Sequence, residues 1–418
     1  MNRESRHTKP VSRSRNGPTG PSPGPGVPRV KQLLGVIPTA SWTVVMGSGI
    51  ISIDLYSDHQ PVLSAIMLWF AAGTWLLLAV VLAARLVDQR DRFAREASSP
   101  ASLTGVAGTA VLGTRFATQD YHVAAVALLA VSCVGWALLL MPVLRHWKTP
   151  TLGISFVLCV ATEGLAVLGA TLAITYRAGW LVSTAVPVLV LGLAFYVFTA
   201  ARFDLHELFT GHGDHWVAGG ALAISALAAG KITEAAGALG QFSEQHQILA
   251  ASTLVLWCLA MAWLLPLIAG EVLRPRLSYD VRRWATVFPL GMYAACSFTA
   301  SQVTGITGIA GFGHVWTWVA FTVTLLVLAG LFRHGWPVLR GQHRPAAAQD
   351  GRRARAGSGE LQGHAGQRGA ISEQPVLGLE IVGRRVCRAR LLVIEVAARH
   401  PCVRIRADGQ PCLGHRGE

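Results

Sequence analysis

Ten apolar segments of roughly membrane-spanning length are the feature of this sequence that most restricts its fold. A bilayer core about 30 Å thick takes roughly 20 helical residues to cross. Backbone amides inside lipid find hydrogen-bond partners only within a closed element, so each segment is expected to be a helix. The segments lie at about residues 36–55, 62–84, 102–118, 122–144, 152–174, 180–201, 216–238, 247–270, 286–310 and 314–336. The sequence therefore predicts an all-α integral membrane protein with ten transmembrane helices joined by short linkers.

The regions on either side of these segments have a different composition. Residues 1–34 are rich in Pro, Gly, Ser and Arg, and such a segment buries too little apolar surface to offset its ordering entropy. We expect them to form a disordered cytoplasmic tail, and residues 35–338 to form the transmembrane domain. We expect residues 339–418 to be a basic, disordered cytoplasmic tail. A small regulatory element or a non-native extension from an altered reading frame are the alternatives for this last region.

Positive charge gathers on one side of the predicted segments. The chain has 36 Lys and Arg against 22 Asp and Glu, a formal net charge of +14. Seven Lys or Arg precede the first segment, and four lie in each of the loops after the second and eighth, whereas Arg177 is the only one in an outer loop. Lys and Arg accumulate in cytoplasmic loops. We therefore expect both termini to be cytoplasmic in a multi-pass protein of the cell (inner) membrane, and we expect no nucleic-acid partner, because orientation accounts for the charge.

Glycine and ionisable residues alternate between the segments. The odd-numbered segments are rich in glycine, and they also hold Asp54, Arg115, Glu163, Lys231 and Glu234. A charged side chain at the bilayer midplane costs about 2.5–3.5 kcal/mol or more, and glycine permits close approach of helix backbones. The simplest architecture is five helical hairpins in which the odd-numbered helices form an inner ring and the even-numbered helices face lipid.

Three stretches carry a resemblance to a known family. The first segment contains IPTASWTVVMGSGIIS from Ile37 to Ser52, the seventh begins HWVAGGALAI at His215, and the ninth begins WATVFPLGMY at Trp284. These stretches resemble the tellurite-resistance/dicarboxylate transporter family, which includes the guard-cell slow anion channels. The resemblance covers about residues 34–338, and the Trp-Ala-x-x-Phe-Pro stretch is its most specific part.

The resemblance implies a central quasi-five-fold pore, a homotrimer and passage of small anions. In that family a phenylalanine occludes the pore, and Phe288, which precedes a proline in the ninth segment, is the matching residue. A packed core aromatic is the alternative for Phe288. Pro289 removes one helical hydrogen bond, and we expect a pore kink there and at Pro38. A favoured first-turn proline is the alternative for Pro38.

Four ionisable residues are further candidates for proton coupling or for lining the pore. Glu163 is either a proton-coupling carboxylate or a buried carboxyl hydrogen-bonded to Thr162 or to a neighbouring helix. Lys231 either attracts anions or forms a silent pair with Glu234, three residues further along the helix. Arg115 either draws anions to the outer mouth or extends to lipid headgroups.

No catalytic residue, cofactor or metal site is predicted. Histidines and acids gather in the loop before the seventh segment, but no Hx3H or HExxH spacing accompanies them. The residues concerned are Asp204, His206, His212, Asp214 and His215. We expect a solvated loop, and no enzyme.

The sequence thus predicts a multi-pass plasma-membrane transporter or channel whose partners are a small anion and the lipid bilayer. The candidate substrates are C4-dicarboxylate, sulfite, halide, nitrate or a tellurite-linked anion, passing a phenylalanine gate. The intramembrane acids leave a proton-coupled dicarboxylate carrier or exporter as the alternative. A membrane-embedded enzyme, or a sensor acting through the tails, is a more remote alternative.

Overall fold

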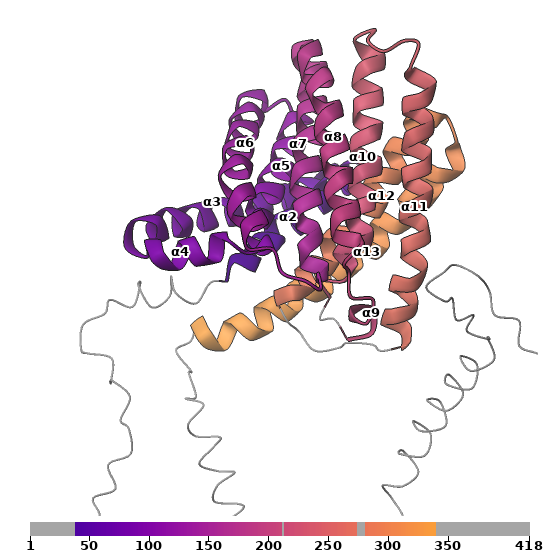
Figure 1. Cartoon of the computed structure of the whole chain (residues 1–418). Helices are drawn as coiled ribbons and strands as arrows, with labels where there is room; N and C mark the ends of the chain where they lie inside the picture. Colours follow the sequence, from indigo (N-terminus) through magenta and orange to yellow (C-terminus); the bar gives the residue numbers. More distant parts are fainter. Residues whose placement is uncertain (1–37, 211–212, 274–280, 340–418) are drawn as a thin grey trace, which may run out of the picture. The chain divides into compact units, whose positions relative to one another are not determined.

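The part of the chain that can be described is almost entirely helical. The computed structural model describes residues 38–210, 213–273 and 281–339 (Figure 1). These ranges contain no β-strand, although Thr151 and Phe203 form an isolated parallel bridge. An all-α fold is therefore confirmed for them. The predictions for residues 1–34 and 340–418 lie outside the described residues.

Among the described residues, five long helices are almost completely buried. They are α2 (Trp42–Ser57), α5 (Thr104–Ala117), α7 (Val157–Tyr176), α10 (Trp216–Ala238) and α12 (Trp284–Thr304). Four of them follow directly on short 3-10 turns, which are η1 (Thr39–Ser41), η2 (Pro100–Leu103), η3 (Gly153–Phe156) and η4 (Val281–Arg283). These helices correspond to the odd-numbered segments, which the glycine and charge pattern predicts to lie inside.

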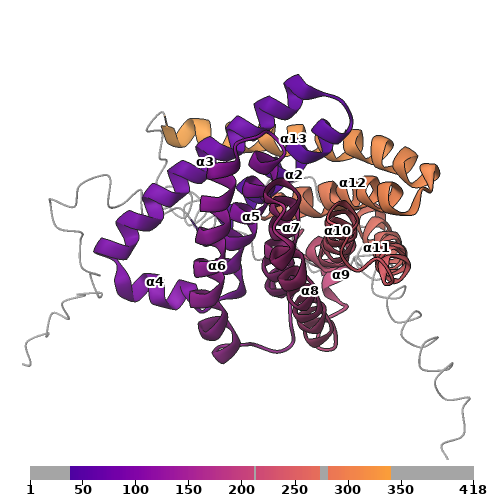
Figure 2. The ribbon, with the colours of Figure 1, turned by 90° about the horizontal axis from the view of Figure 1, so that it is seen from above.

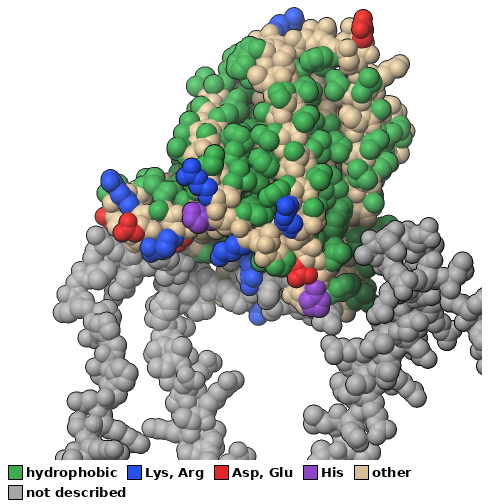
Figure 3. Space-filling model, in the orientation of Figure 1, with side chains coloured by type: hydrophobic (Ala, Val, Ile, Leu, Met, Phe, Trp, Pro, Cys, Tyr) green, Lys and Arg blue, Asp and Glu red, His purple; other side chains and the backbone are tan. Residues whose placement is uncertain are grey.

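The other long helices of the described part present apolar side chains outward. They are α3 (Pro61–Asp88), α6 (His122–Arg145), α8 (Gly179–Ala200), α11 (His246–Leu273) and α13 (Thr307–Leu339). Val62, Val123, Trp180 and Leu265 are each more than half exposed. Figure 3 shows apolar side chains over most of the visible face, with charged side chains gathered toward its lower part. An exterior of this kind suits contact with lipid.

Seven helices of the described residues are long and apolar enough to cross a membrane, namely α3, α6, α7 with its η3 turn, α8, α10, α11 and α13. The buried helices α2 and α5 have only 16 and 14 residues, and α12 is less apolar than the seven candidate helices. A helix surrounded by protein needs neither the length nor the apolarity that lipid contact demands. A count of ten spans therefore stays a prediction where α2, α5 and α12 are concerned.

The buried helices contact one another in a closed order. α2 packs against α5, α5 against α7, α7 against α10, α10 against α12, and α12 against α2. Each also packs against the outer helix that follows it in the chain, and Figure 2 shows those helices outside the buried ones. We call the end where the buried helices begin the proximal end, and the opposite end the distal end. At the proximal end Thr286 Oγ1 donates to Gly213 O at 3.2 Å, which ties the start of α12 to the start of α10.

Glycines make the close contacts between the buried helices possible. A Cβ atom on Gly220 of α10 would stand 2.8 Å from Pro289 Cβ, and one on Gly113 of α5 would stand 2.7 Å from Leu168 Cδ2. One on Gly291 of α12 would stand 2.6 Å from Ile50 Cγ2. Real Cβ atoms do not approach this closely, so a larger residue at these positions would push the helices apart.

We expect Gly220→Ala to destabilise the protein by about 1–3 kcal/mol, the usual range for overpacking a filled interior. The added methyl group meets the backbone and ring of Pro289, neither of which can rotate away. The measurement is the thermal unfolding midpoint in detergent. Gly73→Ala on the outer helix α3, where nothing lies within 4 Å, is the matched control and should not lower the midpoint. Equal midpoints for the two variants would contradict the packing argument.

Candidate functional site

Phe288 and Pro289 lie one turn into α12 from the proximal end. Phe288 is 1% exposed and belongs to the continuous apolar core. Pro289 lies inside the helix and against Gly220 of α10. Because proline has no N–H, the Ala285 carbonyl loses its usual helical donor. The Phe288 ring is thus enclosed by protein, as either a closed gate or a core aromatic would be.

Pro38 precedes a helix instead of interrupting one. It is the N-cap residue of η1, with an extended backbone (φ −72°, ψ 153°), and its carbonyl accepts a hydrogen bond from Ser41 N at 3.0 Å. In the described residues, which begin at Pro38, no helix runs through this position for the proline to bend. The alternative, a proline at a helix start, describes its surroundings better.

Glu163 points away from the centre of the ring, between α7, α8 and α10. Its side chain occupies the space left by Gly192 of α8, where any Cβ atom would collide with it. Its two carboxyl oxygens lie 2.7 and 2.9 Å from Ser225 Oγ, which also lies 2.8 Å from Ala221 O. A hydroxyl has a single proton to donate among these three oxygens. The contacts are best satisfied when Glu163 carries a proton and donates it to Ser225.

Arg115 is completely buried, and its hydrogen-bond partners are all uncharged. Its Nε donates to Ser52 Oγ at 3.1 Å, its Nη2 to Ser64 Oγ at 2.9 Å and its Nη1 to Thr118 Oγ1 at 2.8 Å. The Gln119 amide, with its oxygen toward the guanidinium, accepts from both terminal nitrogens at 3.2 and 2.6 Å. The Tyr56 ring lies 4.2 Å from the guanidinium carbon. The side chain therefore joins α2, α3 and α5 instead of extending to headgroups.

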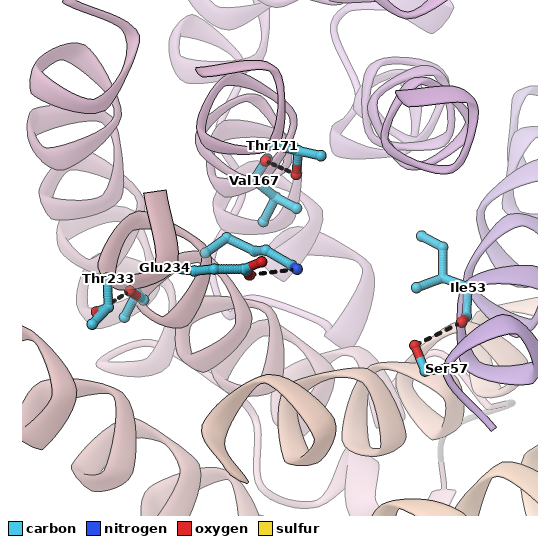
Figure 4. Close-up of polar contacts among 8 residues, drawn as sticks. Ile53, Ser57, Val167, Thr171, Thr233 and Glu234 are labelled. Carbon is cyan, nitrogen blue, oxygen red and sulfur yellow. Dashed lines mark hydrogen bonds and ion pairs between the residues drawn. The ribbon is translucent and has the colours of Figure 1, made fainter. Parts of the chain in front are cut away.

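The distal end carries a partly exposed ion pair. Lys231 Nζ lies 2.7 Å from Glu234 Oε2, and their side chains are 21% and 38% exposed. In Figure 4 the side chains of Ser57, Thr171 and Glu234, from three buried helices, face the same space. Lys231 is thus neutralised locally, which is the silent pairing that the sequence offered as one alternative.

A cluster of acids lies at the proximal end, in the loop that the sequence predicts to be solvated. Glu207 of the short helix α9 (Glu207–Thr210) is 8% exposed and accepts a hydrogen bond from Gly153 N at 2.6 Å. Burial, with the negative charges of Asp214 and Asp204, raises the pKa of Glu207 to about 7, against the lowering effect of the Gly153 N–H. Asp214 and His215 are also buried. The sequence gives no sign of this burial, because it arises where two loops meet.

None of these residues forms a recognisable metal centre. Over residues 38–210, 213–273 and 281–339, no group of three or more His, Cys, Asp or Glu could hold a metal ion. Of the loop histidines singled out above, His212 lies outside the described residues.

We expect Glu207→Gln to remove a pH-dependent loss of stability. The folded-state pKa of about 7 exceeds the ordinary value of 4.5, so the protein loses stability as the pH rises between these values. The glutamine keeps an acceptor for Gly153 N–H and cannot ionise. The gain in thermal midpoint over the unmodified protein should grow between about pH 5 and pH 8. The exposed Glu244→Gln is the matched control; a similar gain there would contradict the assignment.

Comparison with known proteins identifies the family. Residues 37–332 match the family SLAC1, described as voltage-dependent anion channel, from just before α2 to within α13. Two uncharacterized membrane proteins of Mycobacterium tuberculosis, MT1776 of strain CDC 1551 / Oshkosh and Rv1735c of strain H37Rv, are each 30% identical over 146 residues. That alignment covers 32% of this chain and 73% of each relative. The chain is therefore a multi-pass membrane protein that belongs to the SLAC1 family of voltage-dependent anion channels, in agreement with its resemblance to the tellurite-resistance/dicarboxylate transporters.

Proposed function

We propose that this protein conducts small anions through a pore enclosed by α2, α5, α7, α10 and α12. In this proposal ten helices cross the membrane as five hairpins with quasi-five-fold symmetry, and no covalent chemistry is involved. The observation that carries the proposal is the closed order of contacts among the five buried helices, surrounded by helices with apolar exteriors. A ring of this kind separates an interior path from lipid, and membership of an anion-channel family supplies the class of solute.

The electrostatics of the ring support an anion as the solute. All five buried helices begin at the proximal end, and a helix N-terminus carries a partial positive charge of about half an elementary unit. C4-dicarboxylate, sulfite, halide, nitrate and tellurite-linked anions are the proposed substrates, because the pore selects among them by its dimensions and by ion dehydration.

Phe288 is the proposed gate. It is enclosed in the apolar core on one of the ring helices, beside a proline that leaves the carbonyl of Ala285 without its helical donor. An apolar side chain in a narrow passage blocks ions because it offers nothing to replace their hydration shell.

We expect Phe288→Ala to raise anion flux by about tenfold or more, equivalent to lowering a barrier by about 1.4 kcal/mol. The measurement is current or flux through the full chain in liposomes, with chloride, nitrate, sulfite and malate tested separately. Phe321→Ala is the matched control, because Phe321 is also buried but lies on the outer helix α13 and packs against Trp318 of that same helix, with ring centroids 6.0 Å apart. Unchanged flux for every anion in Phe288→Ala, or an equal rise in both variants, would refute the gate.

The location, orientation and assembly form part of the same proposal. We propose the cell membrane, cytoplasmic termini and a homotrimer, the first two from the Lys and Arg distribution and the last from the family resemblance. A reporter that is active only in the cytoplasm, fused after Glu418, should therefore be active. The mass of the purified protein in nanodiscs gives the number of subunits.

A proton-coupled dicarboxylate carrier or exporter is the second candidate, favoured by the buried carboxyl of Glu163. In this version Glu163 exchanges a proton while the anion crosses. Glu163→Gln should then abolish an electroneutral, proton-linked flux of malate, measured with a pH-sensitive dye inside liposomes. In the channel version the same variant leaves the flux intact, since Gln can still donate to Ser225. Charge-carrying currents that survive Glu163→Gln would rule out the carrier.

A further inference from the structure

We propose that Asp54 of α2 is a proton-binding site, loaded from the distal end through His314 and Asp58, and that its protonation state controls the packing of α2 against α12 beside Phe288. The proton site stands on the structure alone, whereas its effect on flux rests on the proposed function.

Asp54 is a completely buried carboxyl group without a partner. Its side chain is 0% exposed, and in the described part of the chain neither carboxyl oxygen has a hydrogen-bond partner. The opposing surface on α12 is Gly291, where a Cβ atom would stand 2.9 Å from Asp54 Oδ2 and 2.6 Å from Ile50 Cγ2. Burying an unpaired carboxylate is far costlier than burying a neutral acid. The site therefore holds a proton.

Within the described residues, the groups around Asp54 supply no compensating positive charge. Asp58, the C-cap residue of α2 one turn beyond Asp54, and Cys296 of α12 interact electrostatically with it, and neither is a cation. Arg115 of α5 donates a hydrogen bond to Ser52 and lies over the ring of Tyr56. These two residues are two positions before and two positions after Asp54, which is a rotation of about 200° around the axis of α2. The guanidinium therefore lies on the other side of α2 from the Asp54 carboxyl. His314 of α13 contacts Asp58, not Asp54. A metal ion is a poor match, because hard cations need several oxygen ligands.

A path for the proton leads from the surface to this carboxyl. The side chain of His314 is 47% exposed, and its Nδ1 contacts Oδ1 of Asp58, whose side chain is 7% exposed. Because Asp58 caps the C-terminal end of α2, this contact lies at the distal end, where water can reach it. Asp58 follows the last residue of α2, and its N–H bonds Asp54 O at 2.8 Å. Side chains four residues apart on a helix have Cβ atoms about 5–6 Å apart, a gap that one side-chain rotation or one water bridges.

The transfer steps balance without any further reactant. A solvent proton binds Nε2 of His314 as the Nδ1 proton passes to Asp58, which leaves the imidazole neutral. Asp58 then gives its proton to the carboxylate of Asp54 and returns to its ionised form. The net change is one proton moved from the distal solvent to Asp54, and loss of the proton follows the same steps in reverse.

The position of Gly291 links this proton to the gate. Gly291 and Phe288 are three residues apart on α12, so they share one side of the helix. A neutral Asp54 tolerates the close contact with Gly291. An ionised Asp54 demands water or another polar group, which this contact excludes, and so it favours separation of α2 from α12 next to Phe288.

The decisive experiment is infrared absorption of the purified full chain near neutral pH, where ordinary Asp side chains are ionised, with a pKa of about 3.9. We expect the carbonyl band of a protonated carboxyl group, part of which disappears in Asp54→Asn. Glu163→Gln is the matched control and should remove a different part of the band. An unchanged band in Asp54→Asn would overturn the proposal. So would a thermal midpoint that rises with Na⁺ in the unmodified chain but not in Asp54→Asn, because Asp54 would then bind a cation instead of a proton.

The path through His314 and Asp58 is tested separately, in variants that keep Asp54. After transfer to heavy water the part of the band assigned to Asp54 shifts as its proton is exchanged. His314→Gln should slow that shift by about 100-fold, the usual loss when a positioned proton donor is removed. An unchanged exchange rate in both His314→Gln and Asp58→Asn would overturn the path.

The effect on transport is tested by anion flux as the distal-side pH is varied. Flux should depend on this pH in the unmodified chain and become independent of it in Asp54→Asn. A pH dependence that persists in Asp54→Asn would overturn the link to the gate. If no variant carries anions, the proposed function fails, and the infrared bands still decide whether Asp54 holds a proton.

Discussion

The whole arrangement depends on how closely the backbones of the buried helices approach one another. Lipid supplies no hydrophobic force between helices, so association inside a membrane rests on close packing and on interhelical polar contacts. Glycine at Gly113, Gly220 and Gly291 brings side chains of one helix against the backbone of the next. The outer helices then have only to cover the ring, and bulky apolar residues serve for that. Small residues inside and large ones outside are thus two consequences of one requirement.

Buried charge is handled differently at each position. Glu163 shares the Ser225 hydroxyl and fills the notch at Gly192. Arg115 keeps its charge and saturates its donors with neutral oxygens, and Lys231 has Glu234. Asp54 alone among these groups has no hydrogen-bonding partner in the described residues. The other ionisable groups named here have hydrogen-bond partners, and Asp54 does not. Its carboxyl is therefore the group to test for exchange of a proton with solvent.

Hydropathy and the spacing of glycine and charge predict much of this fold, because lipid forces those patterns on any spanning chain. The segment expected at 102–118 is α5 at Thr104–Ala117, and the inside position of the odd-numbered helices is correct. The sequence does not predict the direction in which a side chain of a buried helix points. Whether Glu163 faces a central path or Gly192 depends on the rotation of α7 about its axis, which tertiary packing sets. The burial of Glu207 depends on contact between two loops distant in sequence, and no local pattern encodes it.

The environment of Arg115 bears on the order in which the chain enters the membrane. A charged side chain within a membrane resists insertion, most strongly at the bilayer midplane, and Arg115 lies in the last turn of α5. Its partners Ser52, Ser64, Thr118 and Gln119 all come from within four residues downstream or from earlier in the chain. The arginine can thus be solvated by chain that has already been synthesised, before the later hairpins exist. The partner of Glu163 on α10, by contrast, emerges 62 residues later, so that carboxyl enters the bilayer without it.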